Sequence, residues 1–149
     1  MLEPVSTTFL AGKVRQWSLP VVQAPSGADA PRLKRLLLPQ GELAQFYDGE
    51  EGIRYIAMIQ LRPGNPRGNH YHKVKQEFLY LMEGEVLLLV EDLETRQRAS
   101  VPLHGGDLAF IPTRIAHALQ VLQPGFAVEF SAARFDPADI YRMMLTVGI

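Results

Sequence analysis

The chain has 149 residues, of which 47% are hydrophobic, and this length and apolar content can bury one core, so we expect one folded domain. The formal net charge of −1 supplies no electrostatic drive toward nucleic acid or an anionic membrane surface. Because the chain has no cysteine, disulfides and thiolate metal ligands are excluded, and histidine and carboxylate groups remain as metal donors.

Residues 1–32 are predicted to form an N-terminal arm that precedes the main domain, residues 33–149. Four prolines fall in this stretch, with Ser26 and Gly27 between two of them, and proline removes the N–H that a sheet ladder needs. We expect one short strand here at most. Trp17 can dock the arm on the main domain or on a second subunit, where the arm could add a strand to a sheet edge. The arm is therefore also expected to contribute to a homodimer.

From residue 33 the sequence changes to short apolar runs, separated by turn residues at intervals of about eight to twelve residues. Strands with such spacing and no helices between them form antiparallel sheets, packed as a sandwich or closed as a barrel. The predicted strands are Leu33–Leu38, Ala44–Tyr47, Arg54–Leu61, Asn69–His72, Glu77–Met82, Val86–Glu91, Arg98–Leu103, Leu108–Ile111, Ala116–Leu122 and Ala127–Arg134.

Helical spacing occurs only near the C-terminus. Asp136 is a favourable N-cap, and Pro137 stands at the first helical position, where its missing N–H is tolerated. Ile140, Met143 and Met144 recur at intervals of three and four residues and form one apolar stripe. The pattern predicts a short helix over residues 138–145 that packs on the sheets.

Four residues suggest a metal site. Side chains alternate faces along a strand, so His70 and His72 point the same way, about 6.6 Å apart. Glu77 opens the next apolar strand and His117 is the second residue of a later one, and both can face the same interior. Three imidazoles and one carboxylate suit a single divalent ion, and this donor set accepts Fe, Mn, Ni, Co or Zn.

These residues resemble the two motifs of the cupin family. The first, G-x5-H-x-H-x4-E-x6-G, is matched at every fixed position, by Gly64, His70, His72, Glu77 and Gly84. The second, G-x5-P-x-G-x2-H-x3-N, is matched at Gly106, Pro112 and His117, whereas Arg114 and Val121 replace the usual Gly and Asn. The resemblance implies an all-β, antiparallel jelly-roll (cupin) β-barrel that holds the metal ion inside.

The residues around the predicted site suggest a largely apolar wall. Because side chains alternate between the two faces of a strand, Leu79 lies on the same face as Glu77, and Leu119 on the same face as His117. Such a wall suits a small organic ligand. Tyr55 and Glu129 are among the polar residues that could contribute, although packing or surface roles are the expected ones for them.

A second resemblance concerns Arg67. The segment from Arg67 to His72 is similar to the R-G-x-H-x-H segment of cupins that isomerise or epimerise deoxysugar nucleotides, generally without a metal. In those enzymes the arginine contacts the nucleotide diphosphate and histidines move protons. The resemblance implies that Arg67 would bind phosphate and that His70 or His72 would be the general base.

The sequence thus favours a single-domain cupin that binds one divalent metal ion and acts on a small organic molecule, as a dioxygenase or a Lewis-acid isomerase. A metal-free deoxysugar-nucleotide isomerase or epimerase, and a non-catalytic small-ligand binding protein, remain as alternatives. The expected partners are a small-molecule substrate and a second copy of the chain, with no nucleic acid and no membrane. A cytoplasmic location is expected, because no signal-peptide pattern and no apolar run of roughly 20 residues is present.

Overall fold

The structure is a computed structural model, and it describes residues 5–23 and 31–146. Within these ranges the chain is almost entirely β-structure, and no helix there is long and apolar enough to cross a membrane. The elements are β1 (Ser6–Phe9), β2 (Val14–Ser18), β3 (Lys34–Leu38), β4 (Gly41–Gln45), β5 (Tyr55–Leu61), β6 (Arg67–Tyr71), β7 (Glu77–Asp92), β8 (Arg98–His104), β9 (Asp107–Ile111), β10 (Ile115–Ser131), the 3-10 turn η1 (Pro137–Asp139) and β11 (Tyr141–Arg142).

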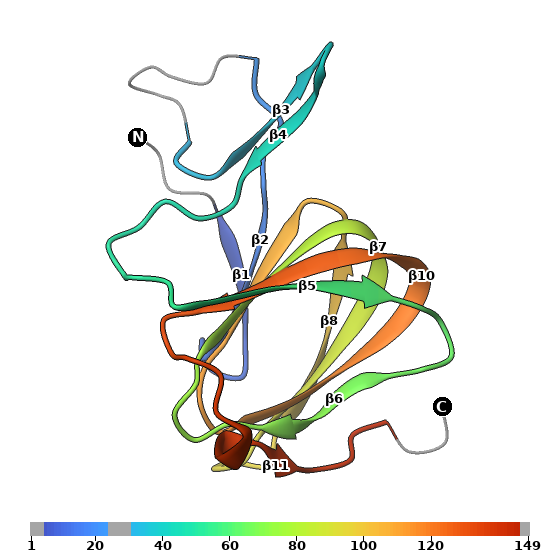
Figure 1. The fold of residues 1–149 in the computed structure, drawn as a ribbon. Coiled ribbons are helices and arrows are strands. Elements are labelled where there is room, and N and C mark those ends of the chain that lie inside the picture. Colours follow the sequence, from blue (N-terminus) through green and yellow to red (C-terminus); the bar gives the residue numbers. More distant parts are fainter. Residues whose placement is uncertain (1–4, 24–30, 147–149) are drawn as a thin grey trace.

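Nine strands form one antiparallel sheet that bends around the core (Figure 1). Its main path runs β1-β2-β9-β7-β10-β6-β11, with β8 paired to β7 and β5 paired to β10. The hairpin β3–β4 forms a separate two-stranded sheet at one end of the molecule (Figure 1). The all-β antiparallel prediction is confirmed. Among the described residues, however, no ladder joins β1 to β11, the two ends of this path. The strands therefore do not form the closed barrel that was expected.

Two long strands, β7 and β10, form the centre of the sheet. Each was predicted as two strands separated by a turn, at Gly84 and at Gly125. The structure instead keeps both strands continuous and pairs them along their lengths, with register shifts between Val121 and Ala127. Gly84 has a φ of 108°, which a side chain would strain. These irregularities act as bulges, which bend a strand without ending it.

Because of the bend, each of these two strands pairs with one neighbour along its first part and with another along its second part. The first part of β7 pairs with β9 and the second part with β8, while the first part of β10 pairs with β6 and the second part with β5. Side chains on the inner face of this bent sheet form the main hydrophobic cluster, which includes Leu81, Leu88, Val101 and Ala127. The inner face therefore has an apolar lining on which the polar residues of the site are placed.

The N-terminal segment forms two strands, where one was expected. β1 and β2 make a hairpin, and β2 pairs with β9 of the same chain. Trp17 packs on a second, aromatic cluster outside the main core that includes Tyr80 and Phe130. Residues 1–4 and 24–30 of the predicted arm and residues 147–149 of the predicted domain lie outside the described residues. The division at residue 32 and the homodimer stay predictions.

The predicted C-terminal helix over residues 138–145 is wrong. Asp136 does cap a helical turn, since its carboxylate accepts a hydrogen bond from the Ala138 N–H at 2.9 Å. The turn η1 nevertheless ends at Asp139, and β11 then pairs with β6. Short helices are marginal because nucleation is costly, and the sheet edge of β6 offers the backbone of this segment hydrogen bonds without that cost.

Candidate metal centre

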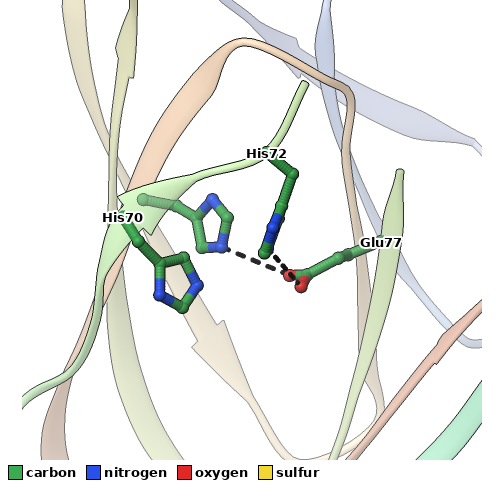
Figure 2. A group of neighbouring side chains, drawn as sticks. His70, His72 and Glu77 are labelled. Carbon is green, nitrogen blue, oxygen red and sulfur yellow. Dashed lines mark hydrogen bonds and ion pairs between the residues drawn. The ribbon is translucent and has the colours of Figure 1, made fainter. Parts of the chain in front are cut away.

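The structure brings His70, His72, Glu77 and His117 together, with one potential ligand atom from each lying within 4.8 Å of all the others. His70 lies on β6 directly opposite His117 on β10, His72 follows the end of β6, and Glu77 is the first residue of β7. Figure 2 shows His70, His72 and Glu77 converging on one another from these elements. His72, Glu77 and His117 are buried, and His70 is half-buried. Three different strands therefore contribute to one compact donor set.

Backbone carbonyl groups fix the orientation of the two buried imidazole rings. Nδ1 of His72 lies 2.7 Å from the carbonyl oxygen of Asp139, and Nδ1 of His117 lies 3.0 Å from that of Ile115. A carbonyl oxygen only accepts, so each Nδ1 carries the proton and donates it. Each Nε2 is then turned toward the Glu77 carboxylate, at 3.0 Å from His72 and 3.3 Å from His117.

This geometry favours a positive charge between the rings and the carboxylate. If both rings were neutral, their Nε2 lone pairs would face the lone pairs of Glu77 and repel them. A proton on Nε2 or a metal ion removes that repulsion. Nε2 of His117 is buried and has no hydrogen-bond partner, although Oε2 of Glu77 lies 3.3 Å away. Metal-bound histidines are typically held in this way, with the second ring nitrogen donating to a carbonyl or carboxylate.

The electrostatics of the centre favour an ionised carboxylate beside a neutral His70. Burial raises the pKa of Glu77, but the nearby His117, His72 and Lys75 outweigh it and hold that pKa well below its usual range. Burial, followed by the neighbouring His117 and His72, lowers the pKa of His70 to about 4. Burial is the largest single influence on His117 and lowers its pKa, but the charge of Glu77, the contact with its carboxylate and the Ile115 carbonyl together outweigh burial and raise that pKa. The centre thus combines a fixed negative charge with an uncharged donor at neutral pH.

Lys75 is a site residue that the sequence analysis missed. Its Nζ lies 3.2 Å from Oε1 of Glu77 and 3.9 Å from Oε1 of Glu129, and 4.2 Å from the ring centroid of Tyr55. The Tyr55 hydroxyl donates to Glu129 at 2.9 Å, and burial, followed by the charge of Glu129, raises the pKa of Tyr55 to about 12. Lys75 lies in the spacer between two predicted ligands, where strand alternation makes no prediction about its direction.

A cavity of about 120 Å³ is lined by three of the four residues, His70, Glu77 and His117. Leu79 and Leu119 lie on its wall as alternation predicted, and Arg67 lies on it as well. Its other lining residues are Ile59, Gly68, Leu88, Ile111 and Glu129. A larger hollow of about 300 Å³, against Trp17 and Phe78, includes none of the four residues. The smaller cavity is therefore the one where a ligand could contact the centre.

Two backbone positions with positive φ hold the ligand strands in place. Gly68 has a φ of 84°, and a Cβ added there would lie 2.8 Å from the carbonyl oxygen of His117. Only glycine therefore allows β6 to approach β10 so closely. Arg114 has a φ of 62°, and its N–H donates to the carbonyl oxygen of His72 at 2.8 Å. The chain thus keeps a left-handed conformation at 114 although arginine replaces the expected glycine.

Comparisons with known proteins agree with this architecture. The family model described as "Cupin domain" matches residues 57–131. A 3-hydroxyanthranilate 3,4-dioxygenase of Brucella anthropi is 33% identical over 61 residues, which cover 41% of this chain and about a third (34%) of the relative.

Solved structures of low sequence identity share the fold. A 3,4-ketoisomerase from Helicobacter canadensis has a TM-score of 0.65 at 20% identity, over 74% of this chain and 86% of the other. The dTDP-6-deoxy-D-glucose-3,5-epimerase RmlC from Legionella pneumophila has a TM-score of 0.74 at 13% identity, over 95% of this chain and 78% of the other. At such identities the likeness shows a common fold and leaves the activity open.

Proposed function

Because this chain belongs to the cupin family, we propose that it binds one divalent metal ion beside its cavity and presents that ion to a small organic substrate. The proposed ligands are His70, His72, Glu77 and His117. The supporting observation is the buried Nε2 of His117, which lacks a hydrogen-bond partner while it faces an ionised carboxylate. A metal ion would satisfy that atom and neutralise the carboxylate at the same time.

The proposed metal would supply Lewis-acid chemistry or, if redox-active, dioxygen chemistry at the cavity. The residues of the chain would bind and shield the substrate. Leu79 and Leu119 would exclude water from the substrate, and the exposed Arg67 would attract an anionic group at the cavity wall. The local sequence likeness to a 3-hydroxyanthranilate dioxygenase supports the dioxygenase form of the proposal.

The proposal is tested first on the wild-type chain. Protein purified without chelator is expected to contain about one divalent metal ion per chain by elemental analysis, since the four residues offer one donor set. After exchange to Co(II), added azide is expected to shift the visible absorption bands, because four protein donors leave positions open on a six-coordinate ion. A chain that takes up none of Fe, Mn, Ni, Co or Zn contradicts the proposal, and an azide-insensitive spectrum contradicts substrate access to the metal.

A second candidate function, isomerisation or epimerisation of a deoxysugar nucleotide without a metal, is favoured by the position of Arg67. Its side chain lines the same cavity as His70, as phosphate binding beside a general base requires. The structurally similar proteins, one named a ketoisomerase and the other an epimerase, also support this second candidate.

Replacement of Arg67 separates the two candidates. If the chain binds nucleotide sugars, Arg67→Ala should remove charge-assisted phosphate contacts worth about 1.5–3 kcal/mol and weaken binding roughly tenfold or more. Calorimetry with dTDP and dTDP-sugars measures this, and Arg62→Ala is the control for a lost exposed cation outside the cavity. If neither wild type nor variant releases heat with any nucleoside diphosphate sugar, the second candidate is excluded.

A further inference from the structure

Asp139 contacts the candidate metal centre through both its backbone and its side chain. Its carbonyl oxygen accepts the Nδ1 proton of His72 at 2.7 Å. Its carboxylate accepts the backbone N–H groups of Lys73 at 2.8 Å, Val74 at 3.2 Å and Lys75 at 3.0 Å. The residue is buried, with 6% of its surface exposed. One residue of the C-terminal turn thus contacts both a proposed ligand and the segment that follows that ligand.

The segment 73–75 lies within the spacer between His72 and Glu77. Successive backbone N–H groups that converge on one anion form a stable concave site, and here the anion is the Asp139 carboxylate. The contact fixes the path of the chain from one proposed ligand to the next. It also fixes the backbone of Lys75, whose ammonium group lies beside Glu77. The His72–Glu77 geometry therefore depends on a residue more than 60 positions away in the sequence.

Other contacts hold Asp139 in place independently of its own carboxylate. β11 pairs with β6, placing Tyr141 opposite Tyr71 and Arg142 opposite His70. The side chain of Asn69 then accepts the N–H of Leu145 at 2.8 Å and donates to the Thr146 hydroxyl at 2.7 Å. Since these bonds anchor the C-terminal segment at β11 and beyond it, a change of the Asp139 side chain should leave the segment docked.

We propose that Asp139 is a positioning residue of the metal centre, whose carbonyl sets the tautomer and direction of His72 and whose carboxylate sets the spacer to Glu77. The inference rests on the proposed metal function. Residues that orient metal ligands typically change metal affinity by 10–100-fold when they are replaced. Asp139 would act through His72 and Glu77 and would touch neither the ion nor the substrate.

The test compares two variants of Asp139 with a control in the same turn. Asp139→Ala is expected to weaken metal binding about 10–100-fold in a competition titration against a chromophoric chelator, and Asp139→Asn, which keeps one acceptor oxygen, by less. Asp136→Ala is the matched control, because the Asp136 carboxylate caps the same turn by accepting the N–H of Ala138. The control is expected to lower the melting temperature while leaving metal affinity unchanged.

A second readout does not require metal. Nitrogen-15 NMR of the metal-free protein reports which ring nitrogens of His72 carry protons. A proton is expected on Nδ1 of His72 in wild type, Asp136→Ala and Asp139→Ala alike, because its acceptor is the backbone carbonyl of residue 139, which both substitutions keep. If Asp139→Ala does not fold, the Asn variant takes its place in both measurements.

The two readouts separate the two proposals. Unchanged metal affinity in the Asp139 variants overturns the role of the carboxylate, and a wild-type His72 whose Nδ1 carries no proton overturns the role of the carbonyl. Loss of affinity that is equally large in Asp136→Ala overturns the role of the carboxylate as well, because general loosening of the turn would then explain the effect. A wild-type chain that binds no metal overturns the proposed function instead, and the His72 tautomer still decides whether Asp139 orients the ring.

Discussion

Glu77→Ala is expected to lower metal affinity by about 100-fold or more, since replacing residues that only orient ligands already costs 10–100-fold. Glu77 is the single carboxylate in the donor set found among the described residues, and two imidazole Nε2 atoms face it. Its removal deletes both a ligand and the negative charge that compensates the ion. Metal per chain after dialysis against a competing chelator measures the effect.

The control for this prediction is Glu83→Ala, which removes an exposed carboxylate from the same strand, β7. That variant should keep the metal content of the wild type. Glu77→Gln adds a second comparison, because it preserves the shape of the side chain and removes only the charge. If Glu77→Ala keeps its full metal content under chelator competition, the four-ligand assignment is wrong.

Gly125→Ala is expected to be strongly destabilising. A Cβ at this position would fall onto the carbonyl group of Glu83, far inside van der Waals contact. Because the obstacle is the backbone of the neighbouring strand, no side-chain rotation can relieve the clash, and β7 and β10 would have to separate where they bend together. We expect a loss of about 3 kcal/mol or more, at the upper end of overpacking effects. For a chain of this size that corresponds to roughly 6–12 °C in melting temperature.

Thermal unfolding followed by circular dichroism measures this loss. Gly52→Ala is the matched control, since a Cβ there meets nothing within 4 Å and its backbone conformation is not left-handed. The control should unfold within about 2 °C of the wild type, as surface substitutions usually change stability by less than 0.5 kcal/mol. If Gly125→Ala also has the melting temperature of the wild type, the bulge between β7 and β10 does not have the close contact described above.

The family, the all-β class and the residues of the candidate centre could be predicted from local patterns. Apolar alternation depends only on neighbouring residues, and it correctly placed Leu79 with Glu77 and Leu119 with His117 on the cavity wall. The motif spacing predicted that His70, His72, Glu77 and His117 would meet, and the structure brings them together. Whether they hold a metal ion stays a prediction for the experiments above.

Glycine positions and the C-terminal pattern were misleading for a common reason. Gly84 and Gly125 stand in segments that are rich in turn residues, yet both lie in bulges. Pairing along the whole of β7 and β10 outweighs the local tendency to end a strand. Residues 138–145 have helical spacing, yet the free edge of β6 pairs with Tyr141 and Arg142 instead. In both cases a partner strand distant in sequence decided the conformation.

The β-class, the family and the set of four chemically suited residues can be inferred from the sequence alone, because each follows from residue type and short-range spacing. The contact of Lys75 with Glu77, and those of Asp139 with His72 and the spacer behind it, become visible in the folded chain. These contacts join a spacer that has no strand periodicity to a C-terminal turn that is remote in sequence. Such contacts depend on how β6, β7 and β11 pack, and no local pattern records that packing.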